Sequence, residues 1–375
     1  MANNITIGDC FRAKEDNFVL LRVLAASAVI YGHSFAISSQ RGYRDLFLQY
    51  VGHTHIAHVA VCIFFVISGF LVTGSYFNRH NWRIYIKARF LRLIPGLAVC
   101  LMLTVFVLGP TVTVLPLYEY FSELFAGILQ LIQNPSERSG RFLLPGVFDE
   151  LRLSGAVNGS LWTLLVEVKM YFYVLLFGVA GVLKRRVFFN FAILMLIIVG
   201  VFYPEFLPLV HNDPKHLRLA ALFAIGAVLY INRDVVPLHG AIVLLLIVLA
   251  VAFNRSEAFM TILSLLIAYG TMWVAYCVPI PFAEKVPDNS YGIYIYAFPI
   301  QQSLVLFFPH IGPYYLGVLA FLIVYPLALA SWYLVEKPSL RLKRGPLLSG
   351  VWVWIKYKFF SLLEWHGSTK GSSDK

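Results

Sequence analysis

Charged side chains are scarce in this sequence. Asp, Glu, Lys and Arg together make up 13% of the 375 residues, whereas they form about a quarter of a typical soluble domain. Hydrophobic residues account for 59% of the chain. A soluble fold of this length needs far more polar surface to cover its core. The composition therefore excludes a conventional soluble domain and predicts an integral membrane protein.

Cysteine is also rare, and no two cysteines form a C-x-x-C pair. Cys62, Cys100 and Cys277 lie inside apolar runs, and Cys10 lies near the start of the chain. This pattern argues against a disulfide framework and against a zinc site, and we expect small packing residues instead. The segment HTHIAH at 53–58 has no accompanying carboxylate pattern. We therefore predict no metal site there and expect an interfacial role in an outer loop.

Long apolar runs are abundant, and they predict an all-α, polytopic bundle of about ten transmembrane helices. A helix needs about 17 to 25 apolar residues to cross a bilayer. Such runs fall near 18–37, 56–76, 94–115, 159–183, 187–203, 217–231, 237–253, 257–277, 289–308 and 313–335. The segment 117–133 contains Glu119 and Glu123, so we expect an interfacial or re-entrant helix there. No small-residue cleavage site follows the first run, which we expect to remain as a helix.

The net charge of +11 does not indicate nucleic-acid binding, because the basic residues lie in short clusters between apolar runs. The two densest clusters, at 79–92 and 184–186, fall on the same side of the predicted topology as both termini. Cytoplasmic loops carry an excess of Lys and Arg, so we predict that both termini are cytoplasmic. The predicted layout is a cytoplasmic segment 1–17, a transmembrane domain 18–345, an amphipathic interfacial helix 346–366 and a disordered tail 367–375.

Two polar residues in the first predicted span, Arg22 and His33, are candidates for function. A charge in hydrocarbon costs at least about 2.5–3.5 kcal/mol, so such residues are usually functional. Eleven residues at about 100° each place both side chains within about 20° of one helix face, roughly 16 Å apart along the axis. The alternative is structural: Arg22 reaches the inner surface, and His33 bonds a neighbouring backbone group.

Glu167 lies about 12 Å into the fourth predicted span, counted from its outer end. A buried carboxylate needs a partner or becomes protonated. One interpretation is a structural ion pair with Arg22 or Lys169. The functional interpretation is a carboxylate that orients or polarises His33.

Other candidates lie at the predicted membrane boundaries. Arg89 and Arg92 share a helix face in the densest basic cluster, and arginine is well suited to bidentate phosphate contact. Binding of anionic lipid headgroups is an equally good explanation for this pair. Ser160 and Trp162 lie at the mouth of the fourth span, where an aromatic ring suits a sugar face. Tyr291 is a candidate for lining a site or for an interfacial aromatic residue. We expect Ser68 and Gly69 to serve close helix packing.

Several segments together resemble the acyltransferase-3 family of integral membrane acyltransferases, many of which O-acetylate bacterial surface polysaccharides. They are R-x10-H at 22–33, IFFVISGFLVTGSY at 63–76, KARFLRLIPG at 87–96, NGSLWTLLVEVKMYFY at 158–173, DNSYGIYIYAFPIQQ at 288–302 and VEKPSLRLK at 335–343. Two positions depart from the family pattern. Many members carry an Asp before the FF of the second segment, where this chain has Cys62, and relatives often have a Pro before Glu167, where this chain reads Leu164-Leu165-Val166.

The resemblance implies transfer of an acyl group, most often acetyl, from acyl-CoA to a hydroxyl of a cell-surface or lipid-linked glycan. It places His33 as general base or acyl relay, Glu167 as its partner, and Arg22 near the thioester or the developing oxyanion. Arg89 and Arg92 would bind CoA phosphates, while Ser160, Trp162 and Tyr291 would contact the acceptor. Acetyl-CoA is then a donor substrate rather than a resident cofactor, and the expected location is the bacterial inner membrane.

The depth of His33 in its helix predicts the direction of substrate entry, and a transporter is the alternative class of protein. His33 lies some 22 Å from the inner start of its helix, so we expect CoA to enter from the cytoplasm and the acceptor from the outer half. The alternative function is a transporter or flippase for a glycan or lipid-linked sugar. Such proteins tend to show paired repeats with broken helices, and no such repeat is evident in this sequence. The oligomeric state is not predicted.

Overall fold

The computed structural model describes residues 5–13, 16–133, 143–207 and 213–344. Within these ranges the chain is helical, and the extended pairing consists of one isolated β-bridge between Thr6 and Pro237. The predicted interfacial helix 346–366 and tail 367–375 lie outside the described residues. The all-α class predicted from the apolar runs is confirmed.

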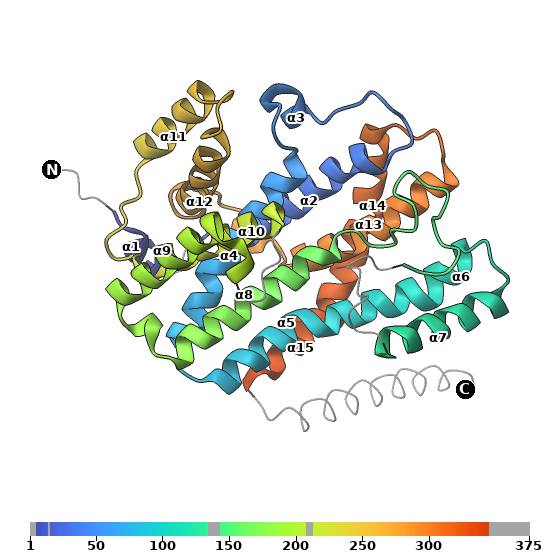
Figure 1. The fold of residues 1–375 in the computed structure, drawn as a ribbon, viewed down its shortest axis with the longest axis horizontal. Helices are drawn as coiled ribbons and strands as arrows, with labels where there is room; N and C mark the ends of the chain where they lie inside the picture. The colour runs from blue at the N-terminus through green and yellow to red at the C-terminus, as the bar shows by residue number, and fades with distance from the viewer. Residues whose placement is uncertain (1–4, 14–15, 134–142, 208–212, 345–375) are drawn as a thin grey trace, which may run out of the picture.

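The helices follow one another along the chain, and the segment 143–160 before α8 is non-helical (Figure 1). The first half contains α1 Ile7–Ala13, α2 Phe18–Ile37, α3 Leu46–Val51, α4 Ile56–Phe77, α5 Trp82–Leu103, α6 Gly109–Val112 and α7 Leu117–Gln133. The second half contains α8 Leu161–Val179, α9 Arg186–Phe202, α10 Pro214–Ile231, α11 Gly240–Ala252, α12 Phe259–Cys277, α13 Ser290–Phe307, α14 Pro313–Ser331 and α15 Lys337–Arg341. Turns of π-helix at Thr104–Leu108 and Trp332–Glu336 join α5 to α6 and α14 to α15.

Seven helices of the described chain are long and apolar enough to cross a membrane. The count of ten spans is not confirmed, although a helix occupies each of the ten predicted positions. Helices α9 and α11 have only 17 and 13 residues. Helix α13 has 18 residues, but its tyrosines, serines and glutamines lower its hydropathy. The predicted orientation of the termini stays a prediction.

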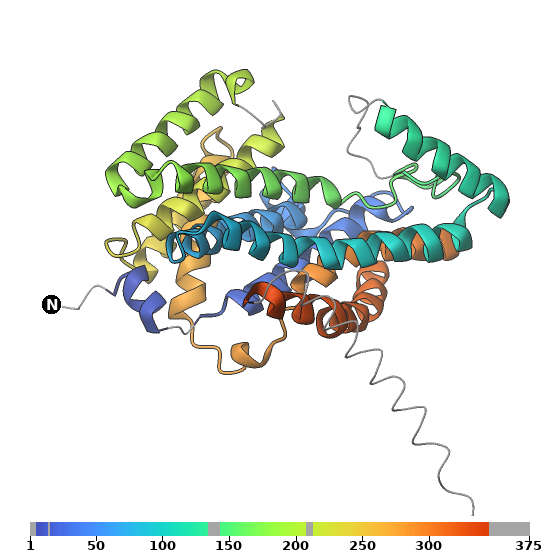
Figure 2. The same cartoon turned by 90° about the horizontal axis from the view of Figure 1, so that it is seen from below.

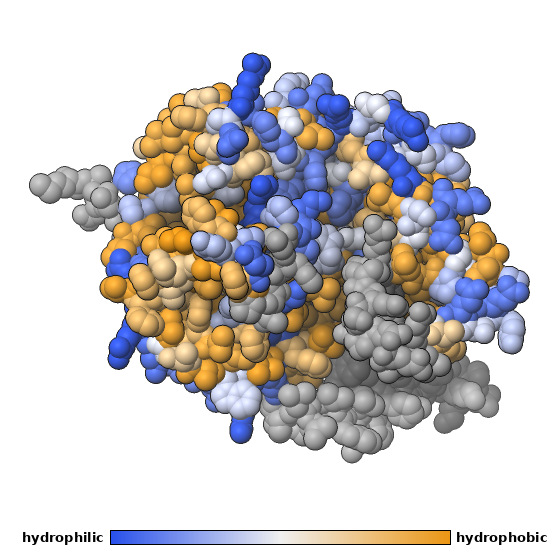
Figure 3. Space-filling model, in the orientation of Figure 1, coloured by the Kyte–Doolittle hydropathy of each residue, from blue (hydrophilic) through white to orange (hydrophobic). Residues whose placement is uncertain are grey.

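The surface agrees with a membrane protein. Many large apolar side chains are exposed, including Leu244, Val248 and Val251 of α11 and Val187 of α9. Figure 3 shows apolar side chains over much of the visible face, with hydrophilic side chains gathered mainly along its upper and right-hand parts. Helix α7 lies at the opposite end of the molecule from α1 (Figures 1 and 2). The Tyr120 hydroxyl joins it to the π-helical turn after α5 by donating to the Val105 carbonyl.

Close backbone contact joins α4 to α10 at the centre of the bundle. A Cβ atom on Gly69 would collide with the Phe223 carbonyl, and one on Gly226 would collide with the Val66 carbonyl. Small residues at such crossings let helices approach closely in membranes. The expected packing role of Gly69 is therefore confirmed. Its neighbour Ser68, for which we expected the same role, faces a cavity instead.

Helix α2 is held in register with α13, which runs parallel to it. Gln301 of α13 is fully buried and donates from Nε2 to the Ile30 carbonyl and to Ser34 Oγ, both at 2.8 Å. At the far end of α2, the guanidinium of Arg152 donates to the Phe35 and Ser38 carbonyls. These bonds satisfy carbonyls at a helix end, where intrahelical partners are missing. They fix the position of α2 along its axis, and with it the positions of Arg22 and His33.

Candidate active site

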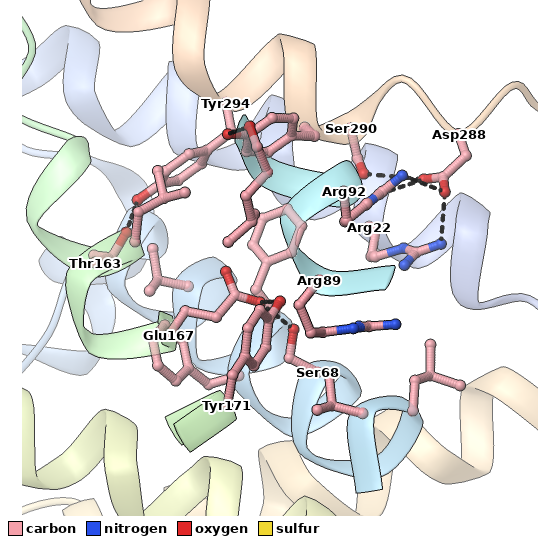
Figure 4. A pocket seen from close by; sticks show the side chains of 18 of the residues that line it. Arg22, Ser68, Arg89, Arg92, Thr163, Glu167, Tyr171, Asp288, Ser290 and Tyr294 are labelled. Carbon is pink, nitrogen blue, oxygen red and sulfur yellow. Dashed lines mark hydrogen bonds and ion pairs between the residues drawn. The ribbon is translucent and has the colours of Figure 1, made fainter. Parts of the chain in front are cut away.

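A cavity of about 240 Å³ lies between α2, α4, α5, α8 and α13 (Figure 4). Its polar lining residues are Arg22, Ser68, Arg89, Arg92, Thr163, Glu167, Tyr171, Asp288, Ser290, Tyr291, Tyr294 and Lys343. Four of these are cations and two are carboxylates, and the remaining wall is largely apolar. The cavity thus combines charge, hydroxyl groups and an apolar wall in one partly enclosed space.

Asp288 joins two of the arginines at one end of this cavity. Its Oδ2 lies 3.2 Å from Arg22 Nη2 and 3.0 Å from Arg92 Nη1, and its Oδ1 accepts from Arg92 Nη2 at 3.2 Å. Burial opposes ionisation, but the two guanidiniums hold the pKa of the Asp288 carboxyl below its ordinary value. Asp288 is thus the partner of Arg22, for which the sequence suggested Glu167 or contact with the inner surface.

Replacing Asp288 by asparagine should destabilise the fold. The side chains of Arg22, Arg92 and Asp288 are all about one-fifth exposed or less, so the change would remove the one carboxylate that forms salt bridges with these two largely buried cations in the described chain. Breaking a buried ion pair on one side typically costs about 3–5 kcal/mol. We expect a clear fall in the thermal midpoint of the detergent-solubilised protein. An unchanged midpoint for Asp288→Asn, beside a matched exposed control such as Asp149→Asn, would show that this bridge contributes little.

Two further cations line the cavity without a carboxylate partner in the described chain. The Arg89 guanidinium lies 5.5 Å from the centre of the Tyr171 ring, a cation–π contact, and its Nε is buried without a hydrogen-bond partner. Lys343 lies beyond the end of α15, where burial and the neighbouring positive charges, Arg89 foremost, lower its pKa to about 8. Neither group forms a salt bridge with a carboxylate of the described chain, and Asp288 offsets the positive charge of Lys343 only in part.

Glu167 reaches the cavity from α8, and hydroxyl groups hold it in place. Its Oε1 accepts hydrogen bonds from Ser68 Oγ and from the Tyr171 hydroxyl, each at 2.6 Å. In the described chain it forms no ion pair with Arg22 or Lys169 and no hydrogen bond with His33. The partners of Glu167 in this conformation are thus hydroxyl groups, and its catalytic role stays a prediction. Figure 4 shows its second oxygen turned away from Ser68 and Tyr171, into the cavity.

Thr163 and Tyr294 line the deep end of the cavity with their hydroxyl-bearing side chains, and Ser160 lies beside them, outside the lining. Thr163 Oγ1 and the Tyr294 hydroxyl lie 2.6 Å apart, and both lie within 3.2 Å of the Ser160 carbonyl, to which each is oriented to donate. All three residues are buried, and Ser160 Oγ has no hydrogen-bond partner. Asn158 fastens this loop to α13 by donating to the Ile295 carbonyl. Loop and helix together therefore close the cavity at this end.

His33 lies beyond this closed end. Its ring packs edge to face on Phe298 with centroids 5.6 Å apart, and its Nδ1 is buried without a hydrogen-bond partner. Phe298 follows Tyr294 by one turn of α13, about 6 Å along the axis. Arg22 lines the cavity, whereas His33 does not. The cavity that contains Arg22 therefore does not extend to His33.

The remaining predicted site residues are divided between the cavity and its surroundings. Tyr291 lines the cavity with its ring, while its hydroxyl donates to the Leu93 carbonyl of α5. Trp162 is half-buried and packs on His216 with centroids 5.0 Å apart, outside the cavity lining. Sequence reasoning missed Asp288 and Thr163 as site residues, although both stand inside segments that carried the family resemblance. Nowhere in the described residues do three His, Cys, Asp or Glu side chains gather in a way that could hold a metal ion.

The family model for an acyltransferase domain matches residues 16–337 of the chain. The chain belongs to the acyltransferase-3 family. This match covers the whole cavity except Leu340 and Lys343, and it confirms the resemblance inferred from the motifs.

Two relatives match this acyltransferase over most of their length. An O-acetyl transferase of Shigella phage Sf6 is 28% identical over 362 residues, which cover 90% of this chain and 99% of the relative. Nodulation protein 10 of Rhizobium leguminosarum bv. viciae is 25% identical over 354 residues, covering 88% of this chain and 94% of that protein. No solved structure matches the chain. Membership of this family and the similarity to an O-acetyl transferase support acyl transfer as the activity of this chain.

Proposed function

We propose that this acyltransferase moves an acyl group, most often acetyl, from acyl-CoA to a hydroxyl of a cell-surface or exported glycan. The observation that carries the proposal is the cavity, which has uncompensated cations at its mouth and a carboxylate and hydroxyl groups deeper inside. The name of the phage relative supports O-acetyl transfer. The expected setting is the bacterial inner membrane, with the cavity mouth on the cytoplasmic side.

The mouth suits the phosphates of CoA. Arg89 and Lys343 are free to bind an anion, because no carboxylate of the described chain pairs with either. Arg92 is engaged by Asp288, yet two guanidiniums on one carboxylate leave a net positive charge there. Arginine contacts phosphate through paired N–H groups, and lysine contacts it as a point charge. Arg89 and Lys343 therefore contact the CoA phosphates directly, and Arg92 and Arg22 add positive electrostatic potential nearby.

The middle of the cavity suits the pantetheine arm. Glu167 keeps Oε1 occupied with Ser68 and Tyr171, so its other oxygen is available to a donor on the substrate. The amide N–H groups of pantetheine are such donors, and a hydrogen bond to a charged acceptor contributes about 1.5–3 kcal/mol. In this role Glu167 positions the thioester at the deep end of the cavity.

The acceptor side lies beyond the closed end. His33 is placed there as the general base that removes the proton of the acceptor hydroxyl, since a neutral imidazole suits proton transfer near pH 7. Ser160 and Trp162 flank the same end of α8 and would contact the glycan. Because Thr163 and Tyr294 line the cavity and His33 does not, the thioester and the acceptor would meet beside the hydroxyls of Thr163 and Tyr294.

The role of Lys343 predicts a pH dependence of donor binding. Its pKa of about 8 means that the ammonium group is charged at pH 7 and largely neutral at pH 9. We expect the KM for acetyl-CoA to rise several-fold between these pH values. Lys343→Arg keeps its charge throughout this range and should flatten the profile. A similar rise in KM with the arginine variant would assign the effect to another group.

The proposed function is tested with purified protein, acetyl-CoA and surface glycan from the source cells that has been deacetylated with alkali. We expect free CoA thiol to appear only when glycan is present, together with an equal amount of alkali-labile acetyl on the glycan. Release of CoA without acetylated glycan would point to a different acceptor. Absence of CoA release from acetyl-CoA would reject this donor.

A further inference from the structure

The hydroxyl groups at the deep end of the cavity are suited to a catalytic role in addition to their place in its wall. Acyl transfer passes through a tetrahedral intermediate, whose former carbonyl oxygen becomes negative and needs hydrogen-bond donors. We propose that the hydroxyls of Ser160, Thr163 and Tyr294 form the oxyanion site of this acyltransferase. The inference rests on the proposed function, and it moves to these hydroxyls the oxyanion role that the family resemblance suggested for Arg22.

Position favours these hydroxyls over the arginine. Arg22 is bound to Asp288 at the mouth, where the CoA phosphates are placed. Thr163 and Tyr294 line the far wall of the same cavity, and Tyr294 lies one helical turn from Phe298, which contacts His33. The reacting carbon must lie between the end of the donor cavity and the base. The hydroxyl cluster occupies that interval.

The cluster also has donor capacity to spare. Ser160 is 1% exposed, yet its Oγ has no hydrogen-bond partner among the described residues. A buried polar group without a partner is costly and often marks a functional site. The Tyr294 hydroxyl now lies against Thr163 Oγ1 and the Ser160 carbonyl. A hydroxyl hydrogen can rotate to a new acceptor without movement of the ring.

The reaction then balances within the groups named. The acceptor oxygen forms a bond to the thioester carbon as His33 takes its proton, and the carbonyl electron pair moves onto the oxygen held by the hydroxyls. Collapse of this intermediate restores the carbonyl and breaks the carbon–sulfur bond. CoA leaves as a thiolate and receives the proton from His33. The products are an O-acyl ester and CoA thiol, with no other reactant required.

The test compares variants that differ by a hydroxyl group. Thr163→Val keeps the shape of the side chain, and Tyr294→Phe keeps the ring, whereas Thr163→Ser retains the donor. Loss of one oxyanion donor can lower kcat by about 100-fold or more. We expect kcat to fall by at least tenfold for Thr163→Val and Tyr294→Phe, with the KM for acetyl-CoA within about twofold of wild type. Thr163→Ser should restore most of kcat.

A matched control separates this role from a structural one. Tyr315→Phe removes an exposed hydroxyl from α14, where the side chain is 78% exposed, and should leave kcat unchanged. An unchanged or raised kcat in Thr163→Val and Tyr294→Phe would overturn the oxyanion site. The two residues would then serve only as a wall between the cavity and His33. A rise in KM alone would also overturn it, because the hydroxyls would then bind substrate in its ground state. Absence of acetyl-CoA turnover in the wild type would instead reject the proposed function.

Discussion

Replacing His33 by alanine should reduce kcat by about 1,000-fold or more, with little change in the KM for acetyl-CoA. General-base catalysis typically contributes 10²–10⁴-fold, and His33 stands outside the donor cavity, so donor binding should not depend on it. The measurement is the rate of glycan acetylation at saturating acetyl-CoA. His33→Gln is the matched variant, since it keeps a polar side chain of similar length but cannot accept the proton effectively.

The split between kcat and KM decides whether this assignment holds. A His33→Ala protein with unchanged kcat would remove the histidine from the chemistry. A large rise in KM with kcat retained would mean that His33 binds the donor, which its place beyond Thr163 and Tyr294 contradicts. Equal losses of kcat in His33→Ala and His33→Gln, with unchanged thermal midpoints of unfolding, would support His33 as the general base.

Replacing Glu167 by glutamine should lower kcat/KM for acetyl-CoA by about 100-fold. The substitution keeps the shape but removes the charge, and hydrogen bonds to charged groups contribute about 1.5–3 kcal/mol each. The two hydroxyls that now donate to Oε1 would meet a neutral amide. Initial rates at low acetyl-CoA concentration measure the effect.

Variants that each lack one of the hydroxyls bonded to Glu167 provide the comparison with Glu167→Gln. Ser68→Ala and Tyr171→Phe each take away one donor to Oε1, and we expect losses of roughly tenfold or less. Their effects should largely disappear in a Glu167→Gln background, because all three changes act on the same carboxylate. Full additivity of the losses would mean that Ser68 and Tyr171 act on substrate independently of Glu167.

The positions of the helices follow from sequence, but the number of spans does not. Apolar runs mark where a helix forms, and each predicted run contains one. Whether a helix crosses a bilayer also depends on its length and neighbours. Helix α11 is as apolar as any predicted span, yet it ends after 13 residues. Helix α13 is polar in composition because it is packed among other helices, with all but a few of its residues buried.

The site was predictable where a charge stands alone in an apolar run. Arg22 and Glu167 were identified for that reason, and both line the cavity. Asp288 was missed because it precedes its helix in a polar loop, where a carboxylate carries no signal. Ser68 was assigned to packing because small residues beside glycine usually serve close helix contact. Helix periodicity placed Arg22 and His33 on one face, but it could not show that Tyr294 from another helix stands between them.

The most direct test of acyl transfer follows two radioactive labels on one acetyl-CoA molecule. Purified protein is incubated with glycan and acetyl-CoA that carries carbon-14 in the acetyl group and tritium in the adenine. We expect carbon-14 to move to the glycan as an alkali-labile ester while tritium stays with free CoA, and we expect His33→Ala to prevent this separation. Both labels remaining together in CoA, with glycan carried across vesicles by the wild-type protein, would contradict acyl transfer.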